Sequence, residues 1–319
     1  MNKIELTDKC PVCASRGIET VGAYRNHHPA FSGLQRAHCL SCNMIFAAPM
    51  PSDEAMNDFN ATYFESAHGG LVQSAEALAF FNAISKIRGR HLAEFLIKKD
   101  LIAASILEIG PGHGFFANNW LISNPGTLYK GLETDKSCHP SLISFGVELI
   151  DSLSDIPSTD VVVISHVLEH VTDPGRFLAN VTAGLKIGGV LFIEVPCMDW
   201  DYKPFDEPHL LFFDKHPMKL LLEKAGYLEI EVSYHGQKIE EIKNESSFKR
   251  KLKGLRSKLM AMGIVRLFAS TKKDLKFLDN PLERAAVAPF KAHLESHKSS
   301  RWLRAVAIKN SNCKTSEQQ

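Results

Sequence analysis

Three alternate glycines stand where an apolar run gives way to a helical pattern, in the order Ile109-Gly110-Pro111-Gly112-His113-Gly114. Glycines let the backbone turn sharply and let a ligand approach it, and the next helix offers unpaired N–H groups. The dinucleotide fingerprint G-x-G-x-x-G fits poorly, because Phe115 stands where its third glycine would fall. Glu108 also disfavours two nearby phosphates, but it could receive a ligand's ammonium group. We therefore predict a cofactor with an amino-acid tail, bound by Glu108, Gly110, Gly112 and Gly114.

A second carboxylate, Glu133, ends the run Tyr129-Lys130-Gly131-Leu132-Glu133. It follows the glycine loop by about twenty residues, where α/β sheets hydrogen-bond ribose hydroxyls. We predict that Glu133 is the ribose ligand. A plain tight turn is the alternative interpretation of the glycine loop, and the two carboxylates disfavour it.

Two pairs of cysteines, Cys10-Pro11-Val12-Cys13 and Cys39-Leu40-Ser41-Cys42, form C-x2-C knuckles. This spacing suits a tetrahedral four-thiolate zinc site, and four protein ligands leave no open position, so the metal is predicted to be structural. The alternatives are unliganded thiols, a redox pair, or His38 as a ligand. Because this segment shows little helical periodicity, we expect it to be held by something other than a hydrophobic core.

Short apolar runs alternate with helical patterns after about residue 100, as expected for strands of a parallel sheet that is covered on both faces. The predicted strands are 105–109, 127–132, 147–150, 161–165, 190–195, 228–234 and 302–308, and the predicted helices are 75–98, 115–122, 174–185 and 215–225. The fold class is therefore α/β, with a doubly wound, mostly parallel, seven-stranded Rossmann-like sheet.

The domain organisation follows from these elements and from the Pro49-Met50-Pro51 boundary. We expect a zinc ribbon over 1–50, a linker and leading helices over 51–100, the core over 101–235, a basic helical insertion over 236–300, the last core strand over 301–311 and a flexible tail over 312–319.

The glycine loop with Glu108, the acidic strand end at Glu133, and the run from Val161 to Val171 together resemble the class I methyltransferases that depend on S-adenosylmethionine. The resemblance covers about residues 105–234 and the strand near Trp302. It implies that the three glycines contact the amino-acid part of S-adenosylmethionine and that Glu133 binds its ribose. It also implies that Asp151 or Ser152 lies near the adenine, and a surface loop is the alternative for this pair. The cysteine knuckles, with Phe46 to Pro51 and Tyr63-Phe64, resemble the ribbon of some sugar and natural-product methyltransferases, where it helps to wall the substrate site.

Methyl transfer from a sulfonium requires alignment of donor and acceptor, and removal of a proton if the acceptor is a hydroxyl. His166, His170 and His209 are the candidate bases, and His166 also lies near the cofactor in this scheme. His209, in the run Asp206 to Phe213, is favoured because that run resembles the family's substrate-side loop. A hydrogen-bonded structural role is the alternative for each histidine, and Glu169 is expected to cap or brace the loop.

Basic residues dominate Phe248 to Lys276, with Phe248, Leu252, Leu255, Leu259 and Met262 on one helical stripe. The segment is interpreted as a lid or outer helix with a solvated face, or as a contact for an anionic membrane or a lipid-linked acceptor. The net charge of +1 gives no global reason for a polyanionic partner, and the ribbon carries no basic and aromatic stripe, so no nucleic acid is expected.

These features predict a methyltransferase that uses S-adenosylmethionine and acts on a small-molecule or glycan acceptor, at oxygen. A dinucleotide-dependent oxidoreductase and a non-catalytic zinc-ribbon binding protein are the alternatives. Residues 1–9 contain charges and no apolar run, and the scattered thiols suit a reducing compartment, so a cytoplasmic location is expected. The oligomeric state is not predicted.

Overall fold

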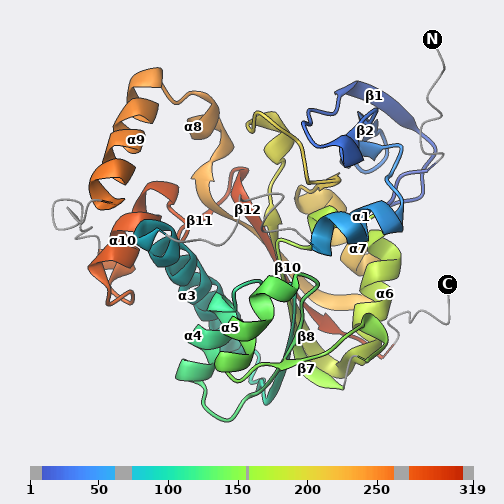
Figure 1. Cartoon of the computed structure of the whole chain (residues 1–319). Coiled ribbons are helices and arrows are strands. Elements are labelled where there is room, and N and C mark those ends of the chain that lie inside the picture. Colours follow the sequence, from blue (N-terminus) through green and yellow to red (C-terminus); the bar gives the residue numbers. More distant parts are fainter. Residues whose placement is uncertain (1–8, 62–73, 156–157, 262–272, 312–319) are drawn as a thin grey trace.

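The computed structural model describes residues 9–61, 74–155, 158–261 and 273–311. The predicted tail over 312–319, together with Tyr63-Phe64 and Met262, lies outside these residues. Two sheets and the helices around them make up the described chain (Figure 1).

The larger sheet has the strand order β11-β10-β12-β8-β7-β4-β5-β6. Strands β6, β5, β4, β7 and β8 run parallel, and β12, β10 and β11 follow in antiparallel pairing. The sheet has eight strands where seven were predicted, because the two-residue β11 pairs with β10. Its strands are β4 (Ser105–Ile109), β5 (Leu128–Leu132), β6 (Glu148–Leu149), β7 (Thr159–Ser165), β8 (Leu185–Pro196), β10 (Tyr227–Lys238), β11 (Glu295–Ser296) and β12 (Ser300–Lys309).

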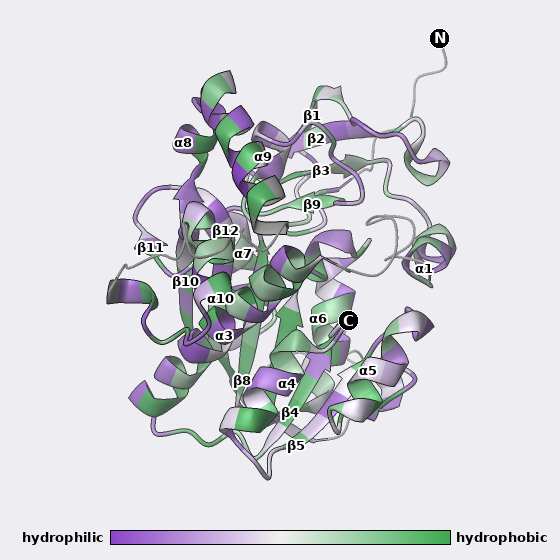
Figure 2. Cartoon of the chain, turned by 60° about the vertical axis from the view of Figure 1, so that its left-hand side comes forward, coloured by the Kyte–Doolittle hydropathy of each residue, from purple (hydrophilic) through white to green (hydrophobic). Residues whose placement is uncertain are grey.

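Helices cover both faces of this sheet, so its central strands are apolar on both sides. Along β8, Phe192 packs with residues of α3 and α4, whereas Ile193 packs with residues of α6 and α7. Figure 2 shows the resulting hydrophobic colour along β4 and β8. The helices that flank the sheet are α3 (Ala75–Lys98), α4 (Phe115–Ser123), α5 (His139–Ser144), α6 (Pro174–Gly184) and α7 (Lys215–Lys224).

The smaller sheet is antiparallel and joins distant parts of the chain. Its fourth strand, β9, comes from the segment between β8 and α7, and Phe46 of β3 pairs with Leu211 of β9. Its strands are β1 (Ile18–Ala23), β2 (Gln35–Cys39), β3 (Ile45–Ala48) and β9 (Leu211–Phe212). Helix α1 (Asp53–Ala61) follows β3 in the chain, and Ser52 Oγ caps it by accepting a hydrogen bond from Ala55 N.

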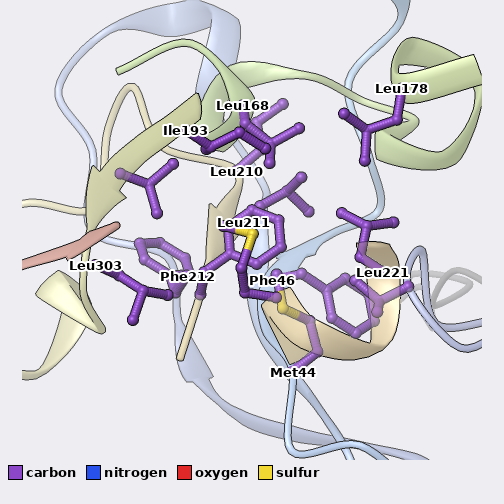
Figure 3. Packing of buried hydrophobic residues seen from close by; sticks show 14 of the residues in the cluster. Met44, Phe46, Leu168, Leu178, Ile193, Leu210, Leu211, Phe212, Leu221 and Leu303 are labelled. Carbon is purple, nitrogen blue, oxygen red and sulfur yellow. The ribbon is translucent and has the colours of Figure 1, made fainter. Parts of the chain in front are cut away.

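The expectation that the cysteine segment lacks a hydrophobic core is wrong. Met44 and Phe46 are fully buried, and they belong to one apolar cluster with Phe212 of β9, Ile193 of β8 and Leu168, which follows β7 (Figure 3). All four residues of β3 are buried, and they belong to the same apolar cluster as Leu168 and Ile193, which was not apparent from helical periodicity.

The segment between β10 and β12 is largely helical, with α8 (Ile239–Lys243), α9 (Ser247–Ala261) and α10 (Pro281–Val287). Helix α9 lies on the opposite side of the molecule from the small sheet in Figure 1. Among the described residues, no helix combines the length and the apolar character that crossing a membrane requires.

Candidate active site

The glycine loop connects the end of β4 to the start of α4, as predicted. Gly110 has φ +67°, and a Cβ there would lie 2.4 Å from Val167 Cγ2. Gly114 has φ +76°, and a Cβ there would lie 2.8 Å from Leu142 Cδ2. Only glycine fits both positions without strain. Gly114 is also the N-cap of α4, and no side chain caps this end of the helix.

Glu133 follows β5 and faces the glycine loop. Its Oε2 accepts a hydrogen bond from Gly112 N at 2.7 Å, and its Oε1 accepts one from Asp135 N at 2.9 Å. Burial raises the pKa of Glu133 above its ordinary value, although the backbone donors oppose this shift. The structure therefore brings Glu133 and the loop together, while ribose binding stays a prediction.

Glu108 is buried within β4, and the phenol of Tyr129 donates a hydrogen bond to its Oε2 at 2.7 Å. Burial raises the pKa of Glu108 to about 7. This pairing gives Glu108 a structural partner that the sequence did not suggest, and its predicted contact with an ammonium group stays a prediction.

Asp151 and Ser152 follow β6, at the same sheet edge as the loop, because the carboxyl ends of parallel strands lie together. Ser152 Oγ contacts Ser154 Oγ and donates to Asp155 Oδ2 at 3.0 Å. Their position near an adenine stays a prediction.

His166 follows β7 in a left-handed conformation, with φ +58°. Its Nε2 lies 3.3 Å from Glu194 Oε1, and its Nδ1 lies 3.3 Å from Glu169 Oε1. Burial alone would lower the pKa of His166, but the two carboxylates outweigh this effect and raise it. A strained backbone beside a sheet edge is typical of functional sites.

Glu194 of β8 is fully buried between two arginines that the sequence analysis missed. Arg88 Nε of α3 donates to it at 2.7 Å, and Arg304 Nε of β12 donates at 2.5 Å. Burial would raise the pKa of Glu194, but the two cations hold it well below its ordinary value. The carboxylate that contacts His166 is therefore charged. Three separate elements supply this group, so no local sequence pattern could have indicated it.

His170 is the last residue of the short η4 helix (Leu168–His170), and His209 lies in the loop before β9. The two side chains lie next to each other. Their ring centroids are 4.9 Å apart. His170 Nδ1 lies 3.2 Å from Pro208 O, and His209 Nδ1 lies 2.7 Å from Asp199 Oδ2. The structure thus brings all three predicted histidines to the same sheet edge, with Glu169 between His166 and His170.

Exposure separates the three histidines. The side chain of His166 is 33% exposed, whereas those of His170 and His209 are each 8% exposed. An acceptor that approaches from solvent can reach His166 most directly. His166 is therefore the most exposed of the three candidate bases, and the choice among them stays a prediction.

The cysteine segment holds the His209 loop in place. Tyr24 Oη donates to His209 O at 2.9 Å, Arg25 N donates to Asp206 Oδ2 at 2.7 Å, and the Arg25 guanidinium forms an ion pair with the same carboxylate. Asp206 is buried. These contacts position the loop that carries His209.

The four cysteines of the two knuckles converge, with their sulfur atoms all within 4.8 Å of one another. Cys10 Sγ lies 3.6 Å from Cys42 Sγ, and Cys13 Sγ lies 3.4 Å from Cys39 Sγ. The two knuckles share one backbone conformation, because Ala14 and Asn43 each have a left-handed φ and donate to the carbonyls of Cys10 and Cys39.

Residues 81–232 match a family model described as "Methyltransferase domain". No curated protein sequence matches the chain.

Several solved structures are similar to the chain. A methyltransferase from Thermotoga maritima, described as a possible histamine N-methyltransferase, has 17% identity and a TM-score of 0.41, covering 71% of this chain and all of its own. A methyltransferase from Archaeoglobus fulgidus has 16% identity and a TM-score of 0.43, and the match covers 77% of this chain and 98% of the methyltransferase. Phosphoethanolamine N-methyltransferase 2 from Haemonchus contortus has 14% identity and a TM-score of 0.46, and the match covers 90% of this chain and 71% of that enzyme. The family match over residues 81–232 confirms the predicted enzyme class, a methyltransferase.

Proposed function

We propose that this protein transfers a methyl group from S-adenosylmethionine to an oxygen atom of a small-molecule or glycan acceptor. The observation that supports this most is the contact between the glycine loop and Glu133, at the carboxyl ends of β4 and β5. A positive helix N-terminus with a nearby carboxylate suits a ligand that carries both an α-carboxylate and ribose hydroxyls.

In this proposal, Gly110, Gly112 and Gly114 contact the amino-acid part of the cofactor, and Glu108 attracts its ammonium group. Glu133 accepts hydrogen bonds from the ribose, sharing its oxygens between the ribose and Gly112 N. Asp151 or Ser152 lies near the adenine. S-adenosylmethionine supplies the electrophilic methyl group when bound.

His166 accepts the proton of the acceptor hydroxyl as the methyl group is transferred. Its partly exposed ring and its contacts with Glu169 and Glu194 support this assignment, because carboxylates orient the ring and stabilise the imidazolium that forms. Alignment of the acceptor with the sulfonium supplies the rest of the rate enhancement.

The four cysteines hold a structural zinc ion in this proposal. Four converging sulfur ligands satisfy the tetrahedral preference of zinc and leave no position for substrate. The zinc would fix both knuckles. It would thereby also hold β1, which leads to Tyr24 and Arg25 at the His209 loop.

In this proposal, helix α9 contacts an anionic membrane or a lipid-linked acceptor. Phe248, Leu252 and Leu255 are exposed on one face, with Lys249 and Lys251 beside them. Apolar and basic side chains on one exposed helix are typical of surface attachment to anionic lipids.

Native mass spectrometry of the purified protein tests the cofactor assignment. We expect a retained ligand with the mass of S-adenosylmethionine or S-adenosylhomocysteine. A retained nicotinamide dinucleotide would instead support the oxidoreductase interpretation. Incubation with methyl-labelled S-adenosylmethionine and a panel of hydroxylated small molecules and sugars would then identify the acceptor and the methylated atom.

A further inference from the structure

Glu169, His170 and His209 bring a carboxylate and two imidazoles together at the buried junction between η4 and the loop before β9. One potential ligand atom from each residue lies within 4.8 Å of the other two. Counted over the whole residue, backbone included, Glu169 is 1% exposed, His170 is 7% exposed and His209 is 6% exposed. Polar groups that are buried this completely need partners that compensate for lost water.

The hydrogen bonds of the two histidines orient their rings toward this junction. Pro208 O and the Asp199 carboxylate can only accept hydrogen bonds, so the Nδ1 atoms of His170 and His209 carry the protons. Each ring then directs the lone pair of its Nε2 atom away from that partner. Metal-binding histidines use this arrangement, in which a carbonyl or carboxylate fixes the tautomer of the ligand.

The carboxylate of Glu169 is available to a cation. Both of its oxygens are buried, and neither forms a hydrogen bond of good geometry with a donor of the described residues. Its ion-pair neighbours are His166 Nδ1 at 3.3 Å and His170 Nε2 at 3.9 Å. A carboxylate that is buried without such hydrogen bonds lowers the free energy of unfolding, and a bound metal ion would compensate for this loss.

We propose that Glu169, His170 and His209 bind a divalent first-row transition-metal ion, through the Glu169 carboxylate and the two Nε2 atoms. Two histidines and one carboxylate form a recurrent ligand set for zinc and iron, and three protein ligands leave coordination positions open. Metal–ligand distances of about 2.1 Å require the three ligand atoms to approach one another by roughly 1 Å. The proposal concerns metal binding alone and does not depend on methyl transfer.

The surrounding contacts pre-organise this site. Leu210 N donates to Glu169 O at 2.8 Å, which ties the two ligand-bearing segments together. Tyr24 Oη holds the His209 carbonyl, and Lys203 Nζ lies 2.7 Å from Asp199 Oδ2. Asp199 is thus a positioning residue for His209.

Cobalt titration can separate this site from the cysteine cluster. The full-length protein is purified with zinc, a chelator wash then removes weakly held metal until metal analysis finds one zinc ion per chain, and this protein is titrated with Co²⁺ and followed by visible absorption and calorimetry. We expect one equivalent of Co²⁺ to bind and to give weak d–d bands without thiolate charge transfer, because nitrogen and oxygen are the ligands. Thiolate charge-transfer bands would mean that Co²⁺ had replaced zinc at the cysteines, and absence of binding would mean that the buried triad holds no metal. Either result would overturn the proposal.

Three variants locate the binding site. Glu169→Gln and His209→Gln remove a ligand each and are expected to abolish binding, whereas Asp199→Asn is expected to weaken it about 10- to 100-fold by loosening His209. His216→Gln, at an exposed histidine of α7, is the matched control and should bind Co²⁺ like the wild type. Thermal melting checks that each variant is folded. If a variant is unfolded, the wild-type titration still shows whether the protein binds Co²⁺ outside the cysteine cluster. Unchanged binding in folded Glu169→Gln and His209→Gln would contradict the assignment.

Discussion

Glu108 is a carboxyl group whose pKa is set by burial in β4. Its folded-state pKa is about 7, above the ordinary value of 4.5. A raised pKa means that the folded state holds the proton more tightly than the unfolded chain does. The stability contribution is therefore complete below about pH 4.5 and is lost as the pH rises through about 7.

Glu108→Gln should remove this pH dependence, because the amide does not ionise. Relative to the wild type, the variant should gain on the order of 2–3 kcal/mol in unfolding free energy between pH 5 and pH 8. Urea unfolding of both proteins at the two pH values measures this difference. A constant difference would show that Glu108 is not a high-pKa group.

His166→Gln should lower kcat by about 10²- to 10⁴-fold on a hydroxyl acceptor, the usual contribution of a general base. Affinity for S-adenosylmethionine should stay the same, because His166 acts on the acceptor in this account. Steady-state kinetics with the identified acceptor measure both quantities, with His216→Gln as the control. A variant that turns over at the wild-type rate would exclude His166 as the base.

The β3–β9 pair is one of the contacts that join the cysteine segment to the rest of the chain. Phe46 is fully buried there, so Phe46→Ala should reduce the unfolding free energy by about 3–5 kcal/mol. Leu40→Ala, at a side chain 59% exposed, should change it by less than about 0.5 kcal/mol. Equal effects in urea unfolding would show that the interface does not contribute to stability.

Elements with strong periodic patterns were predictable from the sequence. The helix expected over 75–98 is α3, and the strand expected over 105–109 is β4, because apolar spacing, caps and flanking turns agree there. Strands β9 and β11 have two residues each and depend on pairing with distant segments, so no local pattern indicates them.

The site was predictable to the same extent. The glycine loop and Glu133 follow strands and could be placed at one sheet edge in advance. Arg88, Glu194 and Arg304 come from three elements, and their contacts exist only after the sheet has formed. Exposure also depends on tertiary packing, so the sequence could not rank His166 and His209 by exposure.

At the scale of the whole molecule, α9 presents an exposed apolar and basic face. Wild-type protein should bind vesicles of anionic lipid at low salt and dissociate at high salt, because screening weakens the attraction. Lys249→Glu with Lys251→Glu should weaken binding about 30-fold or more, at roughly 1 kcal/mol for each lysine lost.

The matched control reverses two exposed lysines elsewhere, Lys136→Glu with Lys219→Glu, and should bind like the wild type. Cosedimentation measures all three proteins. Equal binding to neutral and anionic vesicles, or no binding to either, would exclude an electrostatic membrane contact by α9.

Calorimetric titration with S-adenosylhomocysteine, for wild type and Glu133→Ala, is the most direct test of the cofactor crevice. Loss of the charged acceptor should cost roughly 1.5–3 kcal/mol, a rise in Kd of about 10- to 150-fold. Glu148→Ala, at an exposed carboxylate that pairs with Lys130, should bind like the wild type. Wild-type protein that binds no S-adenosylhomocysteine, or Glu133→Ala that binds it with unchanged affinity, would contradict the account.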